Sequence, residues 1–242
     1  MTWQAGWLRN FTNVESSFKI LEIGAGNFET SKYLAENYSD KNFFAIDFVF
    51  SKHALQTFSN TPRNLTIVKH DARDLSLFQD GYFDMIFSVA VLEHIHELKI
   101  HLDEIYRVLR KGGHYVFYES PFWSSSLGHH YLHWKEDCPI PHYGHLYLDK
   151  ENMENLMKKQ NINSNTTRHI MERVYSRDDL SRLSYTKTKK IIESTNFEIS
   201  KWQTVPDQNY DITYEKRIEE NNIYDLNLED LKIKGIEVIL TK

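Results

Sequence analysis

Two glycines near the start of the chain have the spacing and the context of a nucleotide-type cofactor site. Gly24 and Gly26 follow the apolar run 18–23 and precede a helix-like segment at 31–37. A glycine turn between a strand and a helix lets the backbone approach a ligand, and the helix N-terminus offers free N–H groups. The sequence therefore predicts a cofactor site that includes Gly24, Ala25 and Gly26.

Two glutamates beside this turn indicate which cofactor it binds. A dinucleotide fingerprint has its third glycine where this chain has Glu29. A carboxylate at a helix N-terminus would repel a pyrophosphate. Glu22, two residues before the first glycine, is an acceptor suited to a cationic or amine-bearing ligand. The combination favours S-adenosylmethionine over a nicotinamide dinucleotide and adds Glu22 to the predicted site.

A carboxylate at the end of the next predicted strand suits a ribose. Asp47 lies at the distance from the glycine turn at which such folds place the acidic residue that accepts ribose hydroxyls. Asp47 could instead cap the following helix, but Ser51 is better placed for that. We therefore expect Asp47 and its neighbour Phe48 to bind the adenosyl group.

The ends of two further strands extend the predicted site. Asp71 could accept the adenine amino group, and the Ala72 N–H would complete the recognition; the alternative is an aspartate that caps a turn. Ser88 and Val89 close the fourth strand. Parallel strands place these ends at one edge of the sheet, where such folds bind ligands.

The elements that must position these residues alternate between strand and helix from 18 to 120. Strands are expected at 18–23, 43–46, 65–68, 83–87 and 115–118, and later at 197–205 and 236–241. Helices are expected at 29–37, 51–58, 97–109 and 185–194, the third ended by the cations and glycine cap of Arg110-Lys111-Gly112-Gly113. The order predicts an α/β fold: a Rossmann-like, seven-stranded, mostly parallel sheet with helices on both faces and an insertion after strand five.

The length and composition fit one substantial core, since the chain has 242 residues and 40% of them are apolar. We expect one domain, 1–242. It would contain a cofactor-binding core at 15–120, an acceptor-binding insertion at 121–183, and the final helix and two strands at 184–242. The spacing of Trp3, Trp7 and Phe11 predicts a leading amphipathic helix packed on this domain.

Charge and cysteine content narrow the partners and the compartment. A net charge of −5 gives no basic surface for duplex nucleic acid, and the single cysteine, Cys138, fits a reducing, cytoplasmic setting. No apolar run approaches the ~18 residues of a membrane span, and the first residues lack the layout of a signal peptide. The oligomeric state is left open.

Together these motifs resemble the class I S-adenosylmethionine-dependent methyltransferases. The matching segments, in the family's order, are Glu22-x-Gly24-x-Gly26, Asp47, Asp71-Ala72, Leu92-Glu93-His94 and Leu109-Arg110-Lys111-Gly112-Gly113. Phe28 stands where many members have a third glycine, which changes the loop shape more than the cofactor. The resemblance implies S-adenosyl-L-methionine as cofactor and a small-molecule methyl acceptor.

The insertion is the predicted acceptor site, because histidine and aromatic residues concentrate there. Its histidines at 128–145 are His129, His130, His133, His142 and His145. The segments 121–124, 128–130 and 141–146 resemble methyltransferases encoded with surface-polysaccharide pathways. An alcohol acceptor benefits from a base poised near neutrality, so we predict that His129, His130 or His145 serves O-methylation. Ordinary half-buried loop histidines are the alternative.

A metal site is a second hypothesis for activating the acceptor. Some class I members hold a divalent ion with Glu-x-x-Glu-His after strand four, and here Glu93 and His94 are present but the first glutamate is missing. With His129 and His130 they could bind Mn²⁺ or Mg²⁺, which would acidify the acceptor oxygen. The same segment only shapes the loop in members without a metal.

The leading hypothesis is a methyltransferase acting on a hydroxyl or phosphate-type oxygen of a small metabolite or a capsule or surface-glycan precursor. N-methylation of a small amine and a non-catalytic module that binds S-adenosylmethionine remain alternatives. Glu29 disfavours a nicotinamide oxidoreductase.

Overall fold

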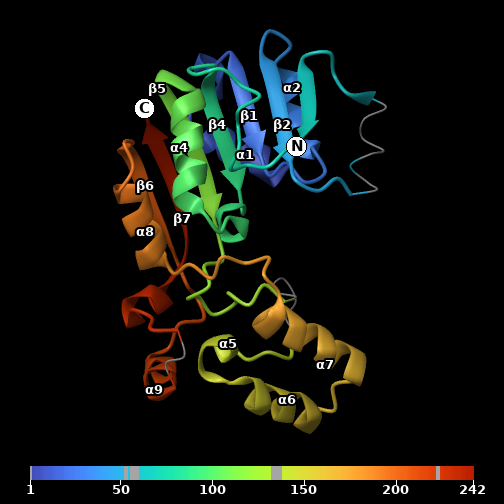
Figure 1. The fold of residues 1–242 in the computed structure, drawn as a ribbon, viewed down its shortest axis with the longest axis vertical. Helices are drawn as coiled ribbons and strands as arrows, with labels where there is room; N and C mark the ends of the chain where they lie inside the picture. Colours follow the sequence, from blue (N-terminus) through green and yellow to red (C-terminus); the bar gives the residue numbers. More distant parts are fainter. Residues whose placement is uncertain (1, 52–53, 55–59, 132–137, 222–223) are drawn as a thin grey trace. The chain divides into compact units, whose positions relative to one another are not determined.

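A seven-stranded sheet forms the centre of the fold in the computed structural model, which describes residues 2–51, 54, 60–131, 138–221 and 224–242 (Figure 1). The strand order is β3-β2-β1-β4-β5-β7-β6. The strands are β1 (Lys19–Ile23), β2 (Asn42–Asp47), β3 (Leu65–Lys69), β4 (Phe83–Val89), β5 (Leu109–Glu119), β6 (Glu198–Pro206) and β7 (Ile233–Thr241). The first five pair in parallel and β7 is antiparallel, so the predicted Rossmann-like, mostly parallel sheet is confirmed.

Helices cover both faces of the first strands. α1 (Trp3–Phe11) and α2 (Glu29–Asn37) lie on one face and α4 (Leu98–Val108) on the other (Figure 1). Leu8 of α1 and Leu34 of α2 are fully buried in one core with Ile20 and Phe43 of the sheet. The leading helix therefore packs on the sheet as predicted, although Trp3 itself is exposed. The helix expected at 51–58 falls largely outside the described residues.

The segment after α4 differs from the prediction. α4 ends at Val108, and the run 110–113 already belongs to β5, with a register shift opposite Phe83 and Met85. The Gly112 N–H donates to Lys242 O at 2.8 Å, and Gly113 O accepts from the Lys242 N–H at 3.1 Å. The predicted glycine cap is wrong because these backbone groups bond to the end of β7 instead of to helix carbonyls.

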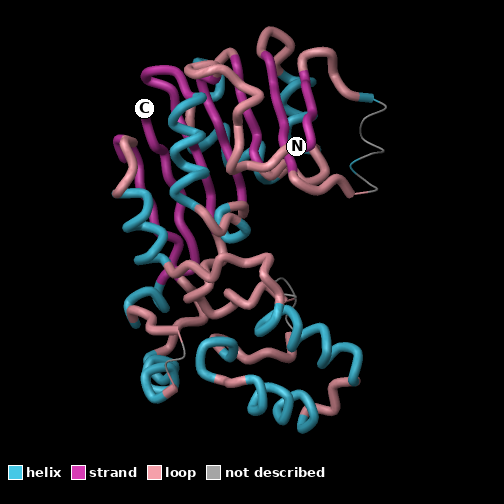
Figure 2. Tube along the Cα trace, viewed as in Figure 1, coloured by secondary structure: helices cyan, strands magenta, loops and turns pink. Residues whose placement is uncertain are grey.

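The chain divides into two compact units. The first consists of Met1–Tyr118, Ile191–Gln203 and Glu237–Lys242, and the second of Glu119–Lys190 and Thr204–Ile236. Helices and loops make up most of the second unit (Figure 2). Its helices are α5 (Gly144–Tyr147), α6 (Lys150–Lys159), α7 (Ser164–Met171), a π-helical turn (Glu172–Ser176), α9 (Ile212–Glu220) and a 3₁₀ turn (Leu228–Lys232). α8 (Tyr185–Glu193) crosses the boundary.

Residues 204–236 pack with the insertion, a link that the sequence did not reveal. Tyr143 donates its hydroxyl to Leu231 O at 2.8 Å, and its ring lies with Ile218 of α9 in one buried cluster. Asp207 accepts 2.6 and 2.8 Å bonds from the Ser126 N–H and hydroxyl. Among the described helices, none is long and apolar enough to cross a membrane.

Candidate functional site

The glycine turn after β1 uses its two glycines differently. Gly24 has φ +67°, and a Cβ there would lie 2.4 Å from Val91 Cγ2, so the turn packs directly against the segment that follows β4. Gly26 has φ +56°, but a Cβ there would meet no atom within 4 Å. Gly24 is therefore required by packing, whereas Gly26 adopts a left-handed conformation beside open space that a ligand can enter.

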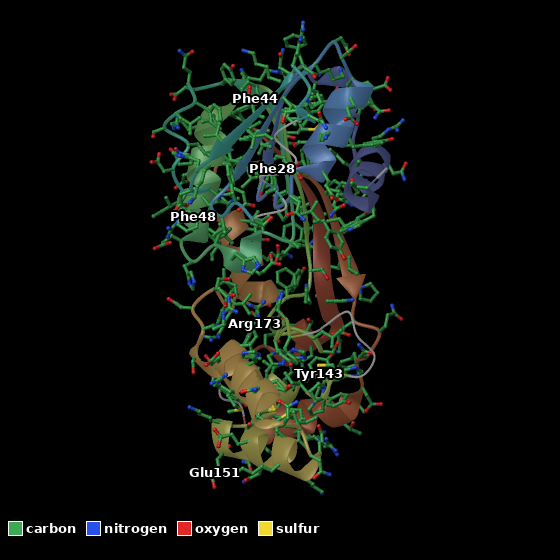
Figure 3. The ribbon with its side chains drawn as sticks, turned by 90° about the vertical axis from the view of Figure 1, so that its right-hand side faces the viewer. Phe28, Phe44, Phe48, Tyr143, Glu151 and Arg173 are labelled. Atoms are coloured by element: carbon green, nitrogen blue, oxygen red, sulfur yellow. The ribbon has the colours of Figure 1, made fainter. Side chains whose placement is uncertain are left out.

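Asp47 binds this turn directly. Its carboxylate accepts bonds of 2.8 Å from the Gly26 N–H and 2.8 Å from the Val49 N–H. Phe48 projects beside it with 66% of its surface exposed, an unusual state for a large apolar ring (Figure 3). Ser51 accepts from the Ala54 N–H at 2.9 Å, so Ser51, rather than Asp47, has the capping geometry. The Asp47 carboxylate, the turn at Gly26 with open space beside it, and the exposed Phe48 ring therefore lie together at the end of β2.

Glu22 has a structural partner, Ser31, that no motif in the sequence indicates. The buried carboxylate accepts a 3.0 Å bond from the Ser31 N–H and another from the Ser31 hydroxyl, which joins β1 to the first turn of α2. Burial raises the pKa of Glu22 from 4.5 to about 7 despite these bonds. Its predicted contact with the amine end of a ligand stays a prediction.

Asp71 is bonded by Arg73, a second partner that no motif in the sequence indicates. Arg73 donates to both oxygens of Asp71, at 3.0 Å through Nε and 2.7 Å through its terminal nitrogen, and also bonds to Glu97. The hydrogen bonds from Arg73 hold the pKa of Asp71 below its usual value. An adenine amino group would therefore share this carboxylate with Arg73.

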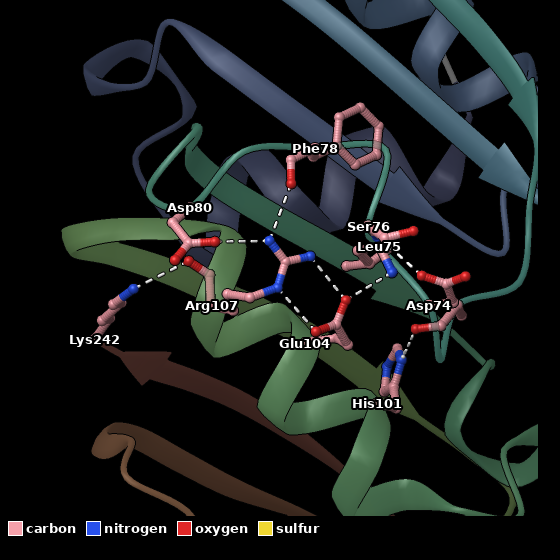
Figure 4. Close-up of polar contacts among 10 residues, drawn as sticks. Asp74, Leu75, Ser76, Phe78, Asp80, His101, Glu104, Arg107 and Lys242 are labelled. Carbon is pink, nitrogen blue, oxygen red and sulfur yellow. Dashed lines mark hydrogen bonds and ion pairs between the residues drawn. The ribbon is translucent and has the colours of Figure 1, made fainter.

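The loop that follows β3 is anchored on α4 (Figure 4). Arg107 donates to Phe78 O at 3.0 Å and to Asp80 at 2.8 Å, and Glu104 accepts from the Leu75 N–H at 2.8 Å. Ala72 O accepts from His101 Nδ1–H at 2.7 Å. These bonds fix the segment that carries the predicted adenine contacts.

Ser88 faces a buried polar chain rather than solvent. Its hydroxyl lies 2.7 Å from the Tyr115 hydroxyl, which lies 3.5 Å from His101 Nε2. Burial lowers the pKa of His101 to about 4, so the ring is neutral at physiological pH. The chain links the end of β4 through β5 and α4 to Ala72, and it can hold two of the predicted cofactor segments in register. Val89 completes β4 at this edge.

The predicted metal ligands fall in different units. Glu93, half-buried, and His94, exposed, lie on a 3₁₀ turn (Leu92–His94) of the first unit, whereas His129 and His130 belong to the second. In the described part of the chain, no group of three or more histidine, cysteine, aspartate or glutamate side chains is arranged to hold a metal ion. The metal hypothesis therefore has no ligand set among these residues.

The three candidate base histidines are buried and bonded to backbone. His130 Nε2–H donates to Pro121 O at 2.9 Å, His145 Nε2–H donates to Trp123 O at 2.7 Å, and His129 Nδ1 accepts from the Tyr131 N–H at 3.0 Å. Burial lowers the pKa of His145 to about 4, below the near-neutral value expected of a base. His133 lies outside the described residues.

Several buried polar atoms of the second unit have no partner among the described residues, and some of them belong to Trp123 or to residues that contact it. No described residue pairs with Trp123 Nε1, Ser124 Oγ, His145 Nδ1, Ser181 Oγ or Arg182 Nε. The Trp123 and His145 rings are 4.7 Å apart, and the Arg182 guanidinium lies 5.2 Å from the Trp123 ring centre. Each buried polar group left unpaired costs about 1–3 kcal/mol, so such a concentration within one unit is unusual.

Comparison with known proteins decides the family. Residues 21–117 match the family described as a methyltransferase domain, and this range includes the glycine turn, Asp47 and Asp71. The strand order of the sheet is that of the same family. Residues 21–117 are a class I S-adenosylmethionine-dependent methyltransferase domain. The predicted family is thus confirmed.

The relatives of this methyltransferase domain act on different acceptors by name. A fatty-acid O-methyltransferase of Mycolicibacterium smegmatis is 29% identical over 122 residues, which span 45% of this chain and 42% of the relative. The match therefore covers less than half of that protein. The likeness of the insertion to surface-polysaccharide enzymes stays a prediction.

Two solved structures share the fold of the whole chain. Phosphoethanolamine N-methyltransferase 2 of Haemonchus contortus, in complex with S-adenosyl-L-methionine, has a TM-score of 0.58 at 13% identity and covers 99% of this chain and 52% of its own. An S-adenosylmethionine-dependent methyltransferase of Mesorhizobium loti has a TM-score of 0.57 at 14% identity and covers 98% of both chains. At these identities the likeness concerns the fold.

Proposed function

We propose that this protein binds S-adenosylmethionine at the Gly24–Gly26 turn and transfers its methyl group to an oxygen of a small acceptor. The main observation in support of cofactor binding is the bond from the Gly26 N–H to Asp47, with open space beside Gly26. The methyltransferase match of residues 21–117 supports the same cofactor. When bound, the cofactor supplies an activated methyl group on a sulfonium.

Within this proposal, the residues at the carboxyl ends of the strands bind different parts of the cofactor. Asp47 offers carboxylate lone pairs to ribose hydroxyls, and Phe48 offers an exposed ring to an adenine face. The anchored Asp71–Ala72 segment supplies the acceptor and the N–H that adenine recognition needs. Glu22 fixes the start of α2, so that its N-terminus keeps its position beside the turn.

The protein then has to orient the acceptor and take up its proton, since the methyl donor is already activated. His145 is the candidate that we favour for orienting the acceptor hydroxyl, because its Nε2–H donates to Trp123 O and its Nδ1 keeps a lone pair. With a pKa of about 4 it stays neutral and acts as a hydrogen-bond acceptor for a hydroxyl. His129 and His130 remain the candidates for the base that takes up the proton, and both are to be tested beside His145.

An oxygen acceptor is supported by the name of the M. smegmatis relative, a fatty-acid O-methyltransferase. A hydroxyl or phosphate-type oxygen on a small metabolite or surface-glycan precursor stays within this proposal. The H. contortus enzyme, named for phosphoethanolamine, favours N-methylation as the second candidate. The names of the two relatives therefore define which acceptors to test first.

A turnover assay tests the proposal. Purified protein is incubated with S-adenosylmethionine and a panel of decanoate, 3-hydroxydecanoate, glucose 1-phosphate and phosphoethanolamine, and formation of S-adenosylhomocysteine is followed. We expect turnover with an oxygen acceptor, loss of turnover in Asp47→Ala, and no change after exhaustive chelation. Turnover with the amine alone would establish the second candidate, and loss of turnover on chelation would restore the metal hypothesis. Cofactor binding without turnover on a wide panel would indicate a non-catalytic module.

A further inference from the structure

Three consecutive serines in the second unit differ in whether their hydroxyl groups are hydrogen-bonded. Ser124, Ser125 and Ser126 are all fully buried. Ser125 donates to Phe122 O at 2.7 Å, and Ser126 donates to Asp207 at 2.8 Å. Ser124 Oγ has no partner among the described residues. Folding has thus satisfied the neighbours and left the hydroxyl next to Trp123 unsatisfied.

Two side chains that lie beside Trp123 but come from distant segments also have buried polar atoms without a partner among the described residues. His145 comes from α5, its ring 4.7 Å from that of Trp123, and Arg182 comes from the segment before α8. His145 Nδ1, Trp123 Nε1 and Arg182 Nε are buried and find no partner in the described ranges. Native proteins pair nearly all buried polar atoms, so such a group of exceptions among the described residues leaves these atoms available to a bound molecule.

We propose that Trp123, Ser124, His145 and Arg182 bind an organic molecule that carries both a hydroxyl group and an oxyanion, either a carboxylate or a phosphate. Its identification as the methyl acceptor rests on the proposed function, whereas the binding site itself does not.

The donor and acceptor types of these atoms set the ligand chemistry. Because His145 Nε2–H donates to Trp123 O, Nδ1 is an acceptor and requires an O–H from the ligand. Trp123 Nε1–H and Arg182 Nε–H only donate, so they require an oxygen acceptor. The Arg182 guanidinium bonds to backbone carbonyls of Val174 and Arg177, and no carboxylate in the described residues neutralises it. His145 Nδ1 therefore fits a ligand hydroxyl, and the two donors together with the positive charge of Arg182 fit an oxyanion.

Titration without cofactor tests this site. The probes are 3-hydroxybutyrate and glycerol 3-phosphate, with butyrate (oxyanion alone) and glycerol (hydroxyls alone) as controls. The readout is the indole ¹H–¹⁵N NMR signal of Trp123, assigned by its loss in Trp123→Phe, with the exposed Trp3 of the first unit as internal reference. We expect the Trp123 signal to shift with a hydroxy-oxyanion probe at lower concentration than with either control, while Trp3 stays unchanged. Which probe binds more tightly distinguishes carboxylate from phosphate.

Ser124→Ala separates a ligand site from a packing defect. Removal of an unsatisfied hydroxyl should leave the melting temperature unchanged or raise it, and should weaken probe binding by about 5-fold, the effect of one hydrogen bond. Ser125→Ala is the matched control: it should lower the melting temperature, because it removes a satisfied bond, and leave probe affinity unchanged once folded. Arg182→Lys keeps the charge but loses Nε, and should weaken both hydroxy-oxyanion probes.

Two results would overturn the inference: a Trp123 signal that does not move with either probe at tens of millimolar, or shifts that are the same in the wild type and in Ser124→Ala. Neither result bears on cofactor binding, which is measured separately and involves none of these residues. Conversely, a protein that binds the probes but not S-adenosylmethionine would retain this site and lose the proposed function.

Discussion

The Gly26 N–H and the Asp47 carboxylate are joined by a 2.8 Å hydrogen bond between the turn after β1 and the end of β2. A second oxygen of the same carboxylate holds the Val49 N–H. Asp47 thereby shapes the glycine turn and presents its remaining lone pairs at the edge where we propose that the cofactor binds. Loss of the side chain should affect the cofactor site twice, through the turn and through the missing acceptor.

Asp47→Ala should therefore weaken S-adenosylmethionine binding strongly. We expect a loss of about 100-fold or more, the combined effect of two or three hydrogen bonds to a charged group, measured by calorimetry. Asp47→Asn keeps one acceptor oxygen and should lose less. Asp40→Ala, at an exposed turn, is the control and should match the wild type. An Asp47→Ala variant of full affinity would remove Asp47 from the site.

The two glycines of the turn should respond differently to alanine. Gly24→Ala adds a Cβ 2.4 Å from Val91 Cγ2 at a positive φ, so it should lower stability by several kcal/mol. Gly26→Ala meets no atom and should cost about 1 kcal/mol of backbone strain, yet it should impair cofactor binding because the methyl group enters the ligand space. Urea unfolding and calorimetry measure the two effects. Equal stability losses would contradict the assignment of different roles.

The fold could be predicted because it follows from local patterns, and the fold in turn decides where the candidate cofactor residues lie. The alternation of apolar runs predicted the strands of the sheet, and the end of each parallel strand placed Gly24, Asp47 and Asp71 at one edge. The glycine cap predicted at Arg110–Gly113 was wrong because glycines and cations also suit the irregular start of a strand. Only the backbone pairing of Gly112 and Gly113 with the end of β7 distinguishes the two.

The partners of the predicted residues were harder to foresee, since they depend on tertiary contacts. Ser31 meets Glu22 through a helix-to-strand contact, and only the fold shows that Arg73 closes on Asp71. The burial of His129, His130 and His145 could not be read from the sequence, because the unit that contains them also includes residues 204–236, which carry no motif. No pattern in the sequence indicates that Ser124 Oγ and Arg182 Nε lack a partner among the described residues.

Glu22 should make stability fall as pH rises. Its pKa is 4.5 unfolded and about 7 folded, so the folded state binds the proton more tightly; this stability is complete below pH 4.5 and is lost as pH rises through 7. Glu22→Gln keeps an acceptor for Ser31 and removes the buried charge. At pH 8 it should be more stable than the wild type by on the order of 3 kcal/mol. Urea unfolding at pH 5 and pH 8 measures this, and an equal effect at both would contradict it.

His101 should have the opposite pH dependence. Its pKa is lowered from 6.5 to about 4 by burial, so its contribution to stability is complete above pH 6.5 and is lost as pH falls through 4. His101→Gln should flatten the loss of stability between pH 6.5 and pH 4, although it is less stable at pH 7 because it disturbs the bond to Ala72 O. His169→Gln, at an exposed position, is the matched control.

Calorimetric titration of the purified protein with S-adenosylmethionine and with S-adenosylhomocysteine tests the central claim most directly. We expect one site per chain for both ligands, with affinity lost in Asp47→Ala and reduced in Gly26→Ala, and no binding of NAD. The absence of binding by either adenosyl ligand to a folded wild-type protein would contradict the account, as would binding that neither substitution changes.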